Sequence, residues 1–136
     1  MTDNPKKNGE TLKRDTMARL RAAIPLVKMG KVVDASNAVA LLETVIKPFD
    51  RVNIEGDNQK QADFLAQCLC KVDTAKVHDL HMVQSALTLD SHLDVFEKGV
   101  AKKIDFSFSG PQSVRLAKFI REGKIELGAI HTYPEL

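Results

Sequence analysis

From about residue 34 onward, segments whose apolar residues are spaced as in strands alternate with segments whose apolar residues are spaced as in helices. Four strands separated by three helices predict successive βαβ units with right-handed crossovers. We therefore expect the α/β class, with an open, mainly parallel sheet and flanking helices. The strand-like segments are 51–55, 76–82, 104–109 and 124–130, and the helix-like segments are 59–70, 91–98 and the stretch between Gly110-Pro111 and Gly123.

The predicted helices have recognisable ends and apolar faces. A further helix precedes the first strand; Asp34 is a residue type that favours its N-cap, and Pro48 stops it. Asn58 followed by Gln61 fits a capping box for the helix over 59–70. The residues expected to face the core are Val39, Leu42, Val45 and Ile46 in the first helix, Ala62, Leu65, Ala66 and Leu69 in the next, and Val114, Ala117 and Ile120 in the last.

The start of the chain differs in composition from the rest. Residues 1–15 are polar and charged, which is typical of a segment that does not order by itself, and the apolar spacing then allows a short helix from Thr16 that Pro25 ends. Residues 1–31 carry 8 Lys and Arg against 3 Asp and Glu, whereas the remainder carries 12 against 15. The chain thus divides into a flexible basic leader, 1–30, and an α/β domain, 31–136.

Composition narrows the classes of function. The 136 residues, 43% of them hydrophobic, match one domain whose core needs no disulfide or metal. We expect a cytoplasmic protein without membrane contact, because the sequence has no long apolar run and no signal-peptide pattern. Cys68 and Cys70 lack any zinc pattern and are expected to be buried, reduced thiols. The basic excess is confined to the leader and lacks interleaved aromatic residues, so nucleic-acid binding is not expected.

Candidate binding residues follow the carboxyl ends of the predicted strands, where open parallel sheets bind ligands and helices present free N–H groups. Their glycines and amides suit a carbonyl, thioester or phosphate ligand better than a metal, although such turns also need Gly and Asn for structural reasons. His131 lies where a ligand-facing histidine would be, and a structural use fits it equally well. The segments are Gly56-Asp57-Asn58-Gln59, Val83-Gln84-Ser85, Gly110-Pro111-Gln112 and His131-Thr132-Tyr133.

The common catalytic and nucleotide-binding motifs are absent. The chain has neither G-x-G-x-x-G nor a P-loop, and Phe106-Ser107-Phe108-Ser109-Gly110 lacks the leading glycine of a nucleophile elbow. His78 and His81, three apart on a predicted strand, point to opposite faces and do not readily share a metal ion. Asp79 and His81 share a face, where a structural hydrogen bond is favoured over a catalytic pair.

Three stretches carry a more specific signal: GDNQKQADFL (56–65), HDLHMVQS (78–85) and GAIHTY (128–133). With their flanking residues they resemble the N-terminal region of malonate decarboxylase α subunits. This family is similar to class I CoA transferases, including the α subunit of citrate lyase. The resemblance covers nearly everything after Ala18 and implies a CoA-transferase-like, Rossmann-like three-layer α/β domain.

The resemblance implies a reaction and partners. Members of the family act as acetyl-S-ACP:malonate ACP transferases, in which malonate displaces acetate from a thioester on an acyl carrier protein, and other subunits decarboxylate the malonyl-S-ACP. The thiol belongs to a phosphoribosyl-dephospho-CoA prosthetic group on the carrier, so no cofactor is expected on this chain itself. The implied partners are the acyl carrier protein and the decarboxylase subunits of a cytoplasmic complex. A homo-oligomer formed through an exposed sheet edge is a further option.

The resemblance also bears on individual residues. In the wider transferase family a glutamate attacks the thioester and forms an acyl-glutamyl anhydride. That glutamate belongs to a second domain, expected beyond residue 136. The glutamates of this chain match no such motif, so no catalytic residue is nominated among Glu55, Glu97, Glu122 and Glu126.

The family's substrate loop corresponds to Gly56-Asp57-Asn58-Gln59, although the sequence departs from the Gly-rich version common in CoA transferases. Gln84 and Gly110-Pro111-Gln112 are expected as walls of the same site. Because family members are several times longer, the chain is expected to be an N-terminal fragment that has no transferase activity by itself.

Two alternatives stay open beside this interpretation. The α subunit of citrate lyase or another class I CoA transferase would share the fold and change the acid. A non-catalytic module that docks an acyl-carrier partner would share the sequence features without any exchange activity. A stand-alone nucleotide-binding domain is disfavoured by the missing fingerprint.

Overall fold

A computed structural model describes residues 9–56 and 61–131 and confirms the α/β class. Its four strands are β1 (Arg51–Ile54), β2 (Leu80–Ala86), β3 (Ala101–Phe108) and β4 (Glu126–Ile130). They form one sheet in the order β1-β2-β3-β4, and every neighbouring pair is parallel. The predicted open, parallel sheet is therefore present.

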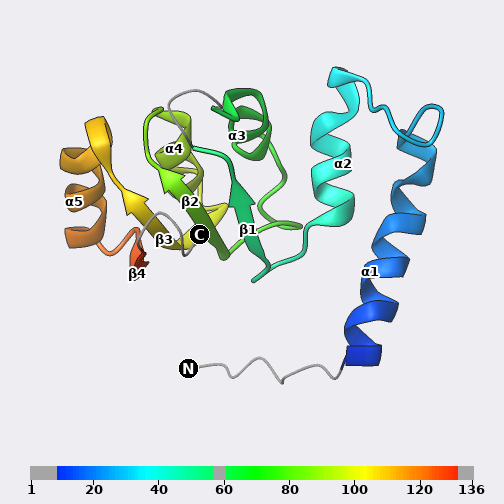
Figure 1. The fold of residues 1–136 in the computed structure, drawn as a ribbon, viewed down its shortest axis with the longest axis horizontal. Coiled ribbons are helices and arrows are strands. Elements are labelled where there is room, and N and C mark those ends of the chain that lie inside the picture. Colours follow the sequence, from blue (N-terminus) through cyan, green and yellow to red (C-terminus); the bar gives the residue numbers. More distant parts are fainter. Residues whose placement is uncertain (1–8, 57–60, 132–136) are drawn as a thin grey trace.

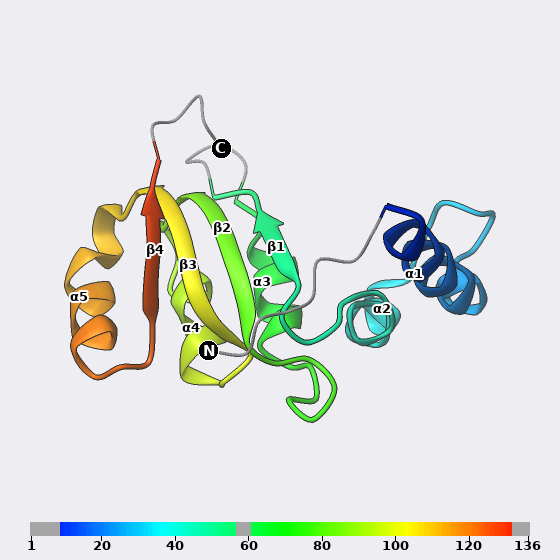
Figure 2. The ribbon, with the colours of Figure 1, turned by 90° about the horizontal axis from the view of Figure 1, so that it is seen from below.

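Three crossover helices lie on one face of this sheet (Figures 1 and 2). They are α3 (Asp63–Leu69), α4 (Ser91–Glu97) and α5 (Ser113–Arg121), the last preceded by a 3-10 turn, Gly110–Gln112. No described residue forms a layer over the opposite face of the sheet, so the described chain has two of the three layers that the resemblance implies. We call this opposite surface the open face.

The core lies between the sheet and this helix layer. Met82 is paired in register with Val52 and Ile104, and these side chains pack against apolar residues of all three helices. Burial of the apolar side of each strand is the main stabilising contribution, at roughly 25 cal/mol per Å² removed from water. The fully buried large residues include Leu69, Leu80, Met82, Leu87, Leu93 and Ile104.

Two helices extend the structure beyond the sheet. The first, α1 (Gly9–Ala23), continues into a 3-10 turn (Ile24–Leu26), and α2 (Ala38–Val45) follows another (Ala35–Asn37). In Figures 1 and 2, α2 lies between α3 and α1, and α1 stands at the edge of the molecule. No described helix is both long enough and apolar enough to cross a membrane.

Several predicted boundaries were wrong. The first helix begins at Gly9 rather than Thr16. The second strand begins at Leu80 rather than at residue 76, because Asp73–Val77 forms a hydrogen-bonded turn and Asp79 has a φ of 53°. The third strand begins earlier than predicted, at Ala101, two residues after Gly99, whose φ of 75° follows the C-cap of α4.

Two helix predictions also need correction. Helix α3 begins at Asp63, with Ala62 at its N-cap and no side-chain cap, and the predicted cap Asn58 lies outside the described residues. In this short helix Ala66 and Leu69 are buried as predicted, whereas Leu65 is exposed.

In α5, Val114 and Ala117 face outward, and Leu116 and Phe119 are buried instead. Leu116, Phe119 and Ile120 are spaced i, i+3 and i+4, so they lie on one side of the α-helix. Ile120 packs against the core as predicted, whereas the prediction was wrong for Val114 and Ala117.

Candidate functional site

Gly56 is the one residue of the predicted substrate loop that the structure describes, and it lies where two strand ends approach closely. Gly56 is buried at the end of β1, and a Cβ at this position would lie 2.1 Å from the carbonyl oxygen of Ala86 on β2. The glycine is thus required by the close approach of two backbones. Asp57, Asn58 and Gln59 lie outside the described residues.

The predicted wall residues lie on the side of the helix layer. Gln84 is 1% exposed, shares the inward side of β2 with Met82, and its amide has no hydrogen-bond partner among the described residues. Gly110 has a φ of 48°, a conformation that favours glycine, and begins with Pro111 the turn that leads into α5. Nε2 of Gln112 donates to Oδ1 of Asp90 at 2.9 Å.

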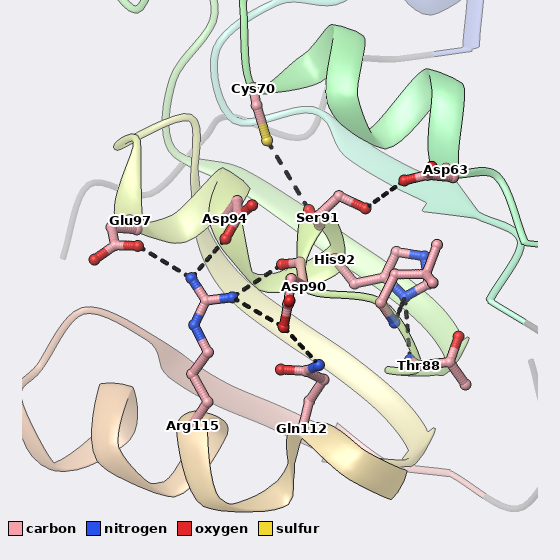
Figure 3. Close-up of polar contacts among 11 residues, drawn as sticks. Asp63, Cys70, Thr88, Asp90, Ser91, His92, Asp94, Glu97, Gln112 and Arg115 are labelled. Atoms are coloured by element: carbon pink, nitrogen blue, oxygen red, sulfur yellow. Dashed lines mark hydrogen bonds and ion pairs between the residues drawn. The ribbon is translucent and has the colours of Figure 1, made fainter.

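A polar network joins α4 to its neighbours at this side (Figure 3). Arg115 of α5 lies 2.5 Å from Oδ1 of Asp94 and 3.0 Å from Oε2 of Glu97, and its other amino group donates to the carbonyl oxygen of Asp90. Burial opposes the charge on this guanidinium, but the two carboxylates outweigh burial and raise its pKa. Because every group is used in a contact between helices, we assign the network to packing.

His92 belongs to the same packing region. It is fully buried, and its Nδ1 accepts from the backbone N–H groups of Thr88 and Leu89, at 3.2 and 3.4 Å. Burial lowers the pKa of His92, so the ring is neutral with its proton on Nε2. The histidine thereby fixes the loop between β2 and α4.

A second polar cluster lies on the open face, and it includes the predicted residue His131. The strand alternation that turns Met82 and Ile104 inward turns His81 and Asp105 outward. Nε2 of His81 lies 2.9 Å from Oδ1 of Asp105, and Nη2 of Arg51 donates to Oδ2 at 2.9 Å. Asp105, in the centre, is nevertheless buried, with a side-chain exposure of 6%.

His131 lies directly after β4 and approaches the same carboxylate. Its Nε2 is 3.7 Å from Oδ2 of Asp105, and its backbone N–H donates to the carbonyl oxygen of Phe106. His81 and His131 are about a quarter exposed, at 24% and 26%, so each ring reaches solvent beside a buried anion. Of the six predicted site residues that the structure describes, one, His131, lies in this cluster.

The carboxylate of Asp105 is held ionised. Burial acts to raise its pKa, but the N–H group of Ala129, the ring of His81 and the charge of Arg51 together lower the pKa to about 2. Ala129 donates to Oδ1 at 2.9 Å, at the point where the register between β3 and β4 shifts. The carboxylate therefore satisfies a backbone donor that the irregular ladder would leave unpaired.

Gly128 makes room for this arrangement. A Cβ at position 128 would lie 1.9 Å from Oδ1 of Asp105 and 2.9 Å from Cε of Lys103. Sequence reasoning passed over both Asp105 and Gly128. A usable signal was present, since Asp105 interrupts the apolar strand IDFSF and Gly128 lies inside the predicted last strand.

The cluster differs from the pair that the sequence suggested. Asp79 is not on a strand; its Oδ2 lies 2.8 Å from Nδ1 of His78, whereas His81 is paired with Asp105. A carboxylate beside an imidazole fixes the orientation of the ring. Within residues 9–56 and 61–131, no group of three His, Cys, Asp or Glu side chains could hold a metal ion.

Cys68 is buried and Cys70 half-buried, and neither forms a disulfide. Sγ of Cys70 lies 3.9 Å from the carbonyl oxygen of Ser91 (Figure 3). Burial, followed by the charge of Asp94, raises the pKa of the Cys70 thiol. The prediction of a buried thiol is confirmed for Cys68, whereas Cys70 is only half-buried, and its raised pKa makes this thiol less reactive than a free one.

Comparisons with known proteins agree on one family. The family model for "Malonate decarboxylase, alpha subunit, transporter" matches residues 8–136. An acetyl-S-ACP:malonate ACP transferase of Malonomonas rubra is 58% identical over 127 residues, which are 93% of this chain and 23% of that protein. The chain therefore spans about a quarter of the length of this relative.

Solved structures give the same result. The malonate decarboxylase α subunit from Acinetobacter baumannii has a TM-score of 0.87 at 45% identity, and the match covers 90% of this chain and 23% of that one. A Pseudomonas malonate decarboxylase hetero-tetramer in complex with malonate has a TM-score of 0.86 at 48% identity, covering 90% and 22%. The predicted resemblance is confirmed: the chain belongs to the family of malonate decarboxylase α subunits.

Proposed function

We propose that this chain is the N-terminal part of a subunit that exchanges acetyl for malonyl on the thiol of an acyl carrier protein. Malonate displaces acetate from the thioester, and the malonyl-S-ACP product passes to decarboxylation. The observation that carries the proposal is the 58% identity with a transferase of this name over 93% of the chain. The all-parallel sheet, with its strand ends available for loops, supports it.

The chain contributes structure to this reaction rather than its nucleophile. The resemblance locates the acyl-accepting glutamate in a second domain. Within the described residues Glu43 is paired with Lys76, and Glu97 with Arg115, so both serve in ion pairs. We infer that this part of the subunit supplies walls of the acyl site at the ends of the strands, through Gly56, the turn at Gly110-Pro111 and His131, whereas Gln84 and Gln112 are buried behind them.

The proposal includes the partners and the place of the reaction. The carrier holds the phosphoribosyl-dephospho-CoA group whose thiol is acylated, and decarboxylase subunits take up the product in a cytoplasmic complex. A hetero-tetrameric malonate decarboxylase among the structural neighbours supports the multi-subunit assembly. Mass spectrometry of carrier co-purified with the subunit tests for the prosthetic group, and cell fractionation tests the location.

An acyl-exchange assay tests the activity. The complete subunit that contains this chain is incubated with acetyl-S-ACP and labelled malonate, and the carrier is then analysed by mass. We expect malonyl-S-ACP with malonate and no acyl exchange with citrate, and no exchange by the 136-residue chain alone. Exchange with citrate in place of malonate would instead indicate a citrate lyase type of subunit, and no exchange with either acid would refute the proposal.

A second candidate is a docking module without catalysis. It is favoured by one observation, that the chain spans only about a quarter of the length of its relatives. Co-purification of the chain with the carrier in the absence of exchange by the complete subunit would support it.

A further inference from the structure

Strand β4 contains one more residue than regular pairing with β3 allows. From the pair of Ile104 and Leu127 to the pair of Phe106 and Ile130, β3 advances by two residues and β4 by three. Two residues of β4 therefore lie opposite the single residue Asp105, which is the arrangement of a β-bulge. We call the inserted position the extra residue of β4.

The extra residue determines the side of the sheet on which His131 lies. In a regular ladder Phe106 would be opposite Ala129, and His131 would belong to the same side as Phe106, toward the helix layer. Ile130 takes the position opposite Phe106 instead, and His131 therefore lies on the open face. A shift of one residue thus moves this side chain from one face of the sheet to the other.

Asp105 holds the extra residue in place. Its Oδ1 accepts from the backbone N–H of Ala129 at 2.9 Å, and the missing Cβ of Gly128 leaves room for this contact. Its Oδ2 lies 3.7 Å from Nε2 of His131 and accepts from Nη2 of Arg51 at 2.9 Å. One buried carboxylate thus contacts both the bulge and the ring whose side the bulge determines.

The open side of the strand ends carries polar atoms without partners. Ser85, Ser107 and His131 are neighbours across β2, β3 and β4, one residue beyond the row that includes Phe106, and the arrowheads of β1 and β4 mark this edge of the sheet in Figure 2. Oγ of both serines and Nε2 of His131 are buried and have no hydrogen-bond partner among the described residues. Nδ1 of His131 is neither buried nor hydrogen-bonded within residues 9–56 and 61–131. Because buried polar groups in proteins usually have partners, this row offers hydrogen-bonding groups to a ligand or to another segment.

We propose that Asp105 is a positioning residue for acyl exchange and acts through His131, an inference that rests on the proposed function. Asp105 holds the extra residue of β4, and the extra residue turns His131 to the open side of the strand ends. There the ring donates from Nδ1 to an oxygen of the acyl group, which accepts hydrogen bonds in a thioester as in a carboxylate. A β-bulge next to an active site commonly re-aims a side chain in this way.

A purely structural role of Asp105 accounts for fewer of these contacts. Regular pairing of β3 with β4 would place the N–H of Ala129 in the ladder and would need no buried carboxylate, whose burial costs free energy. The irregular pairing gains little apolar burial in return, since Ile130 remains 65% exposed. Its consequence for the open face is the position of His131.

Steady-state acyl exchange by the complete subunit tests the proposal, with acetyl-S-ACP and labelled malonate as substrates. Asp105→Ala removes the acceptor of the Ala129 N–H and should lower kcat/KM for malonate about tenfold or more. Asp105→Asn retains an oxygen for this N–H and should stay within about threefold of the unmodified subunit. If Asp105→Ala does not fold, Asp105→Val, whose side chain suits a strand, replaces it.

Variants of His131 separate positioning from a general structural defect. Asn places an amide at the position of Nδ1 and Gln at that of Nε2, so His131→Asn should retain more of kcat/KM than His131→Gln. Adding Asp105→Ala to His131→Gln should cause less than about a twofold further loss, because Asp105 acts through a ring that is already absent. The control is Arg115→Gln, which loses ion pairs between α4 and α5 and should leave kcat/KM within about twofold.

The proposal is overturned if Asp105→Ala leaves kcat/KM unchanged, or if Asp105→Asn loses as much as Asp105→Ala. It is also overturned if His131→Gln retains more than His131→Asn, or if the losses at the two positions multiply in the double variant, since independent defects multiply. Equal losses in Arg115→Gln would have the same meaning. So would a lower urea midpoint of Asp105→Ala without a change in kcat/KM, because the row would then merely pack against the rest of the subunit.

Failure of the proposed function would appear differently. If the unmodified complete subunit exchanges no acyl group, the function fails and the positioning role fails with it. If the unmodified subunit exchanges acetyl for malonyl and the variants at Asp105 and His131 match Arg115→Gln, the positioning role fails and the function stands.

Discussion

Replacing Asp105 by Asn should destabilise the protein in a way that depends on pH. The substitution keeps an oxygen that can accept from the N–H of Ala129, but it removes the charge that faces His81 and Arg51. Because the pKa of Asp105 is about 2 in the folded protein, against an ordinary value of 3.8, its charged form stabilises the fold. The difference corresponds to about 2.4 kcal/mol at 1.36 kcal/mol per pKa unit.

Solvent screening reduces this figure, since the side chain of Arg51 is 60% exposed. We therefore expect Asp105→Asn to lower the free energy of unfolding by about 1 to 2 kcal/mol at pH 7. The folded pKa is depressed, so this contribution is fully present above about pH 4 and is lost as the pH falls toward 2.

Urea unfolding of the wild type and the variant, followed by circular dichroism between pH 2.5 and 7, measures the difference at each pH. Glu55→Gln, which neutralises an exposed carboxylate at the end of β1, serves as the control and should show a small difference throughout. The reasoning is refuted if the difference between wild type and Asp105→Asn is the same at pH 2.5 as at pH 7, or if Glu55→Gln gives the same pH profile.

Three further predictions concern packing. Gly128→Ala places a Cβ 1.9 Å from a carboxylate oxygen and should lower the free energy of unfolding in urea by about 1 to 3 kcal/mol. Gly9→Ala, whose Cβ would meet no atom within 4 Å, is the control and should leave this free energy unchanged. Equal effects of the two substitutions would contradict the close-contact argument. Arg115→Gln removes the cation that pairs with Asp90, Asp94 and Glu97, and it should lower the free energy of unfolding by about 1 kcal/mol. This loss should become smaller at high salt, whereas a loss independent of salt would indicate a packing effect instead. In iodoacetamide labelling at pH 8, Cys70 should react before Cys68 yet more slowly than a free thiol, because burial raises the pKa of Cys70; mass spectrometry of the labelled peptide would contradict this if Cys68 reacted first.

The positions of the strands and the parallel topology of the sheet were predictable because both depend on local sequence patterns. Alternating apolar positions such as Val52 and Ile54 mark a strand whatever it pairs with, and short intervening helices leave few topologies. Helix faces were harder to predict. In α5 the prediction started from Val114, whereas Leu116, Phe119 and Ile120, spaced i, i+3 and i+4, form the side that packs against the core.

The candidate site could be predicted only where it depends on strand ends. His131 was located correctly at the end of the last strand, because that position follows from the strand pattern. Its contact with Asp105 was not predictable, since it depends on a register shift between two strands. The pairing of Asp105 with Arg51 joins residues 54 positions apart, and only the assembled sheet brings them together.

The strands lie in the sheet in the same order as in the sequence, and this affects how the protein folds. Each strand from β2 to β4 pairs with the strand made just before it, so every closure spans only one helix and its turns. Parallel sheets whose neighbouring strands are distant in sequence require larger loop closures and fold slowly. Here the sheet can instead grow by one βα unit at a time, in the direction in which the ribosome delivers the chain.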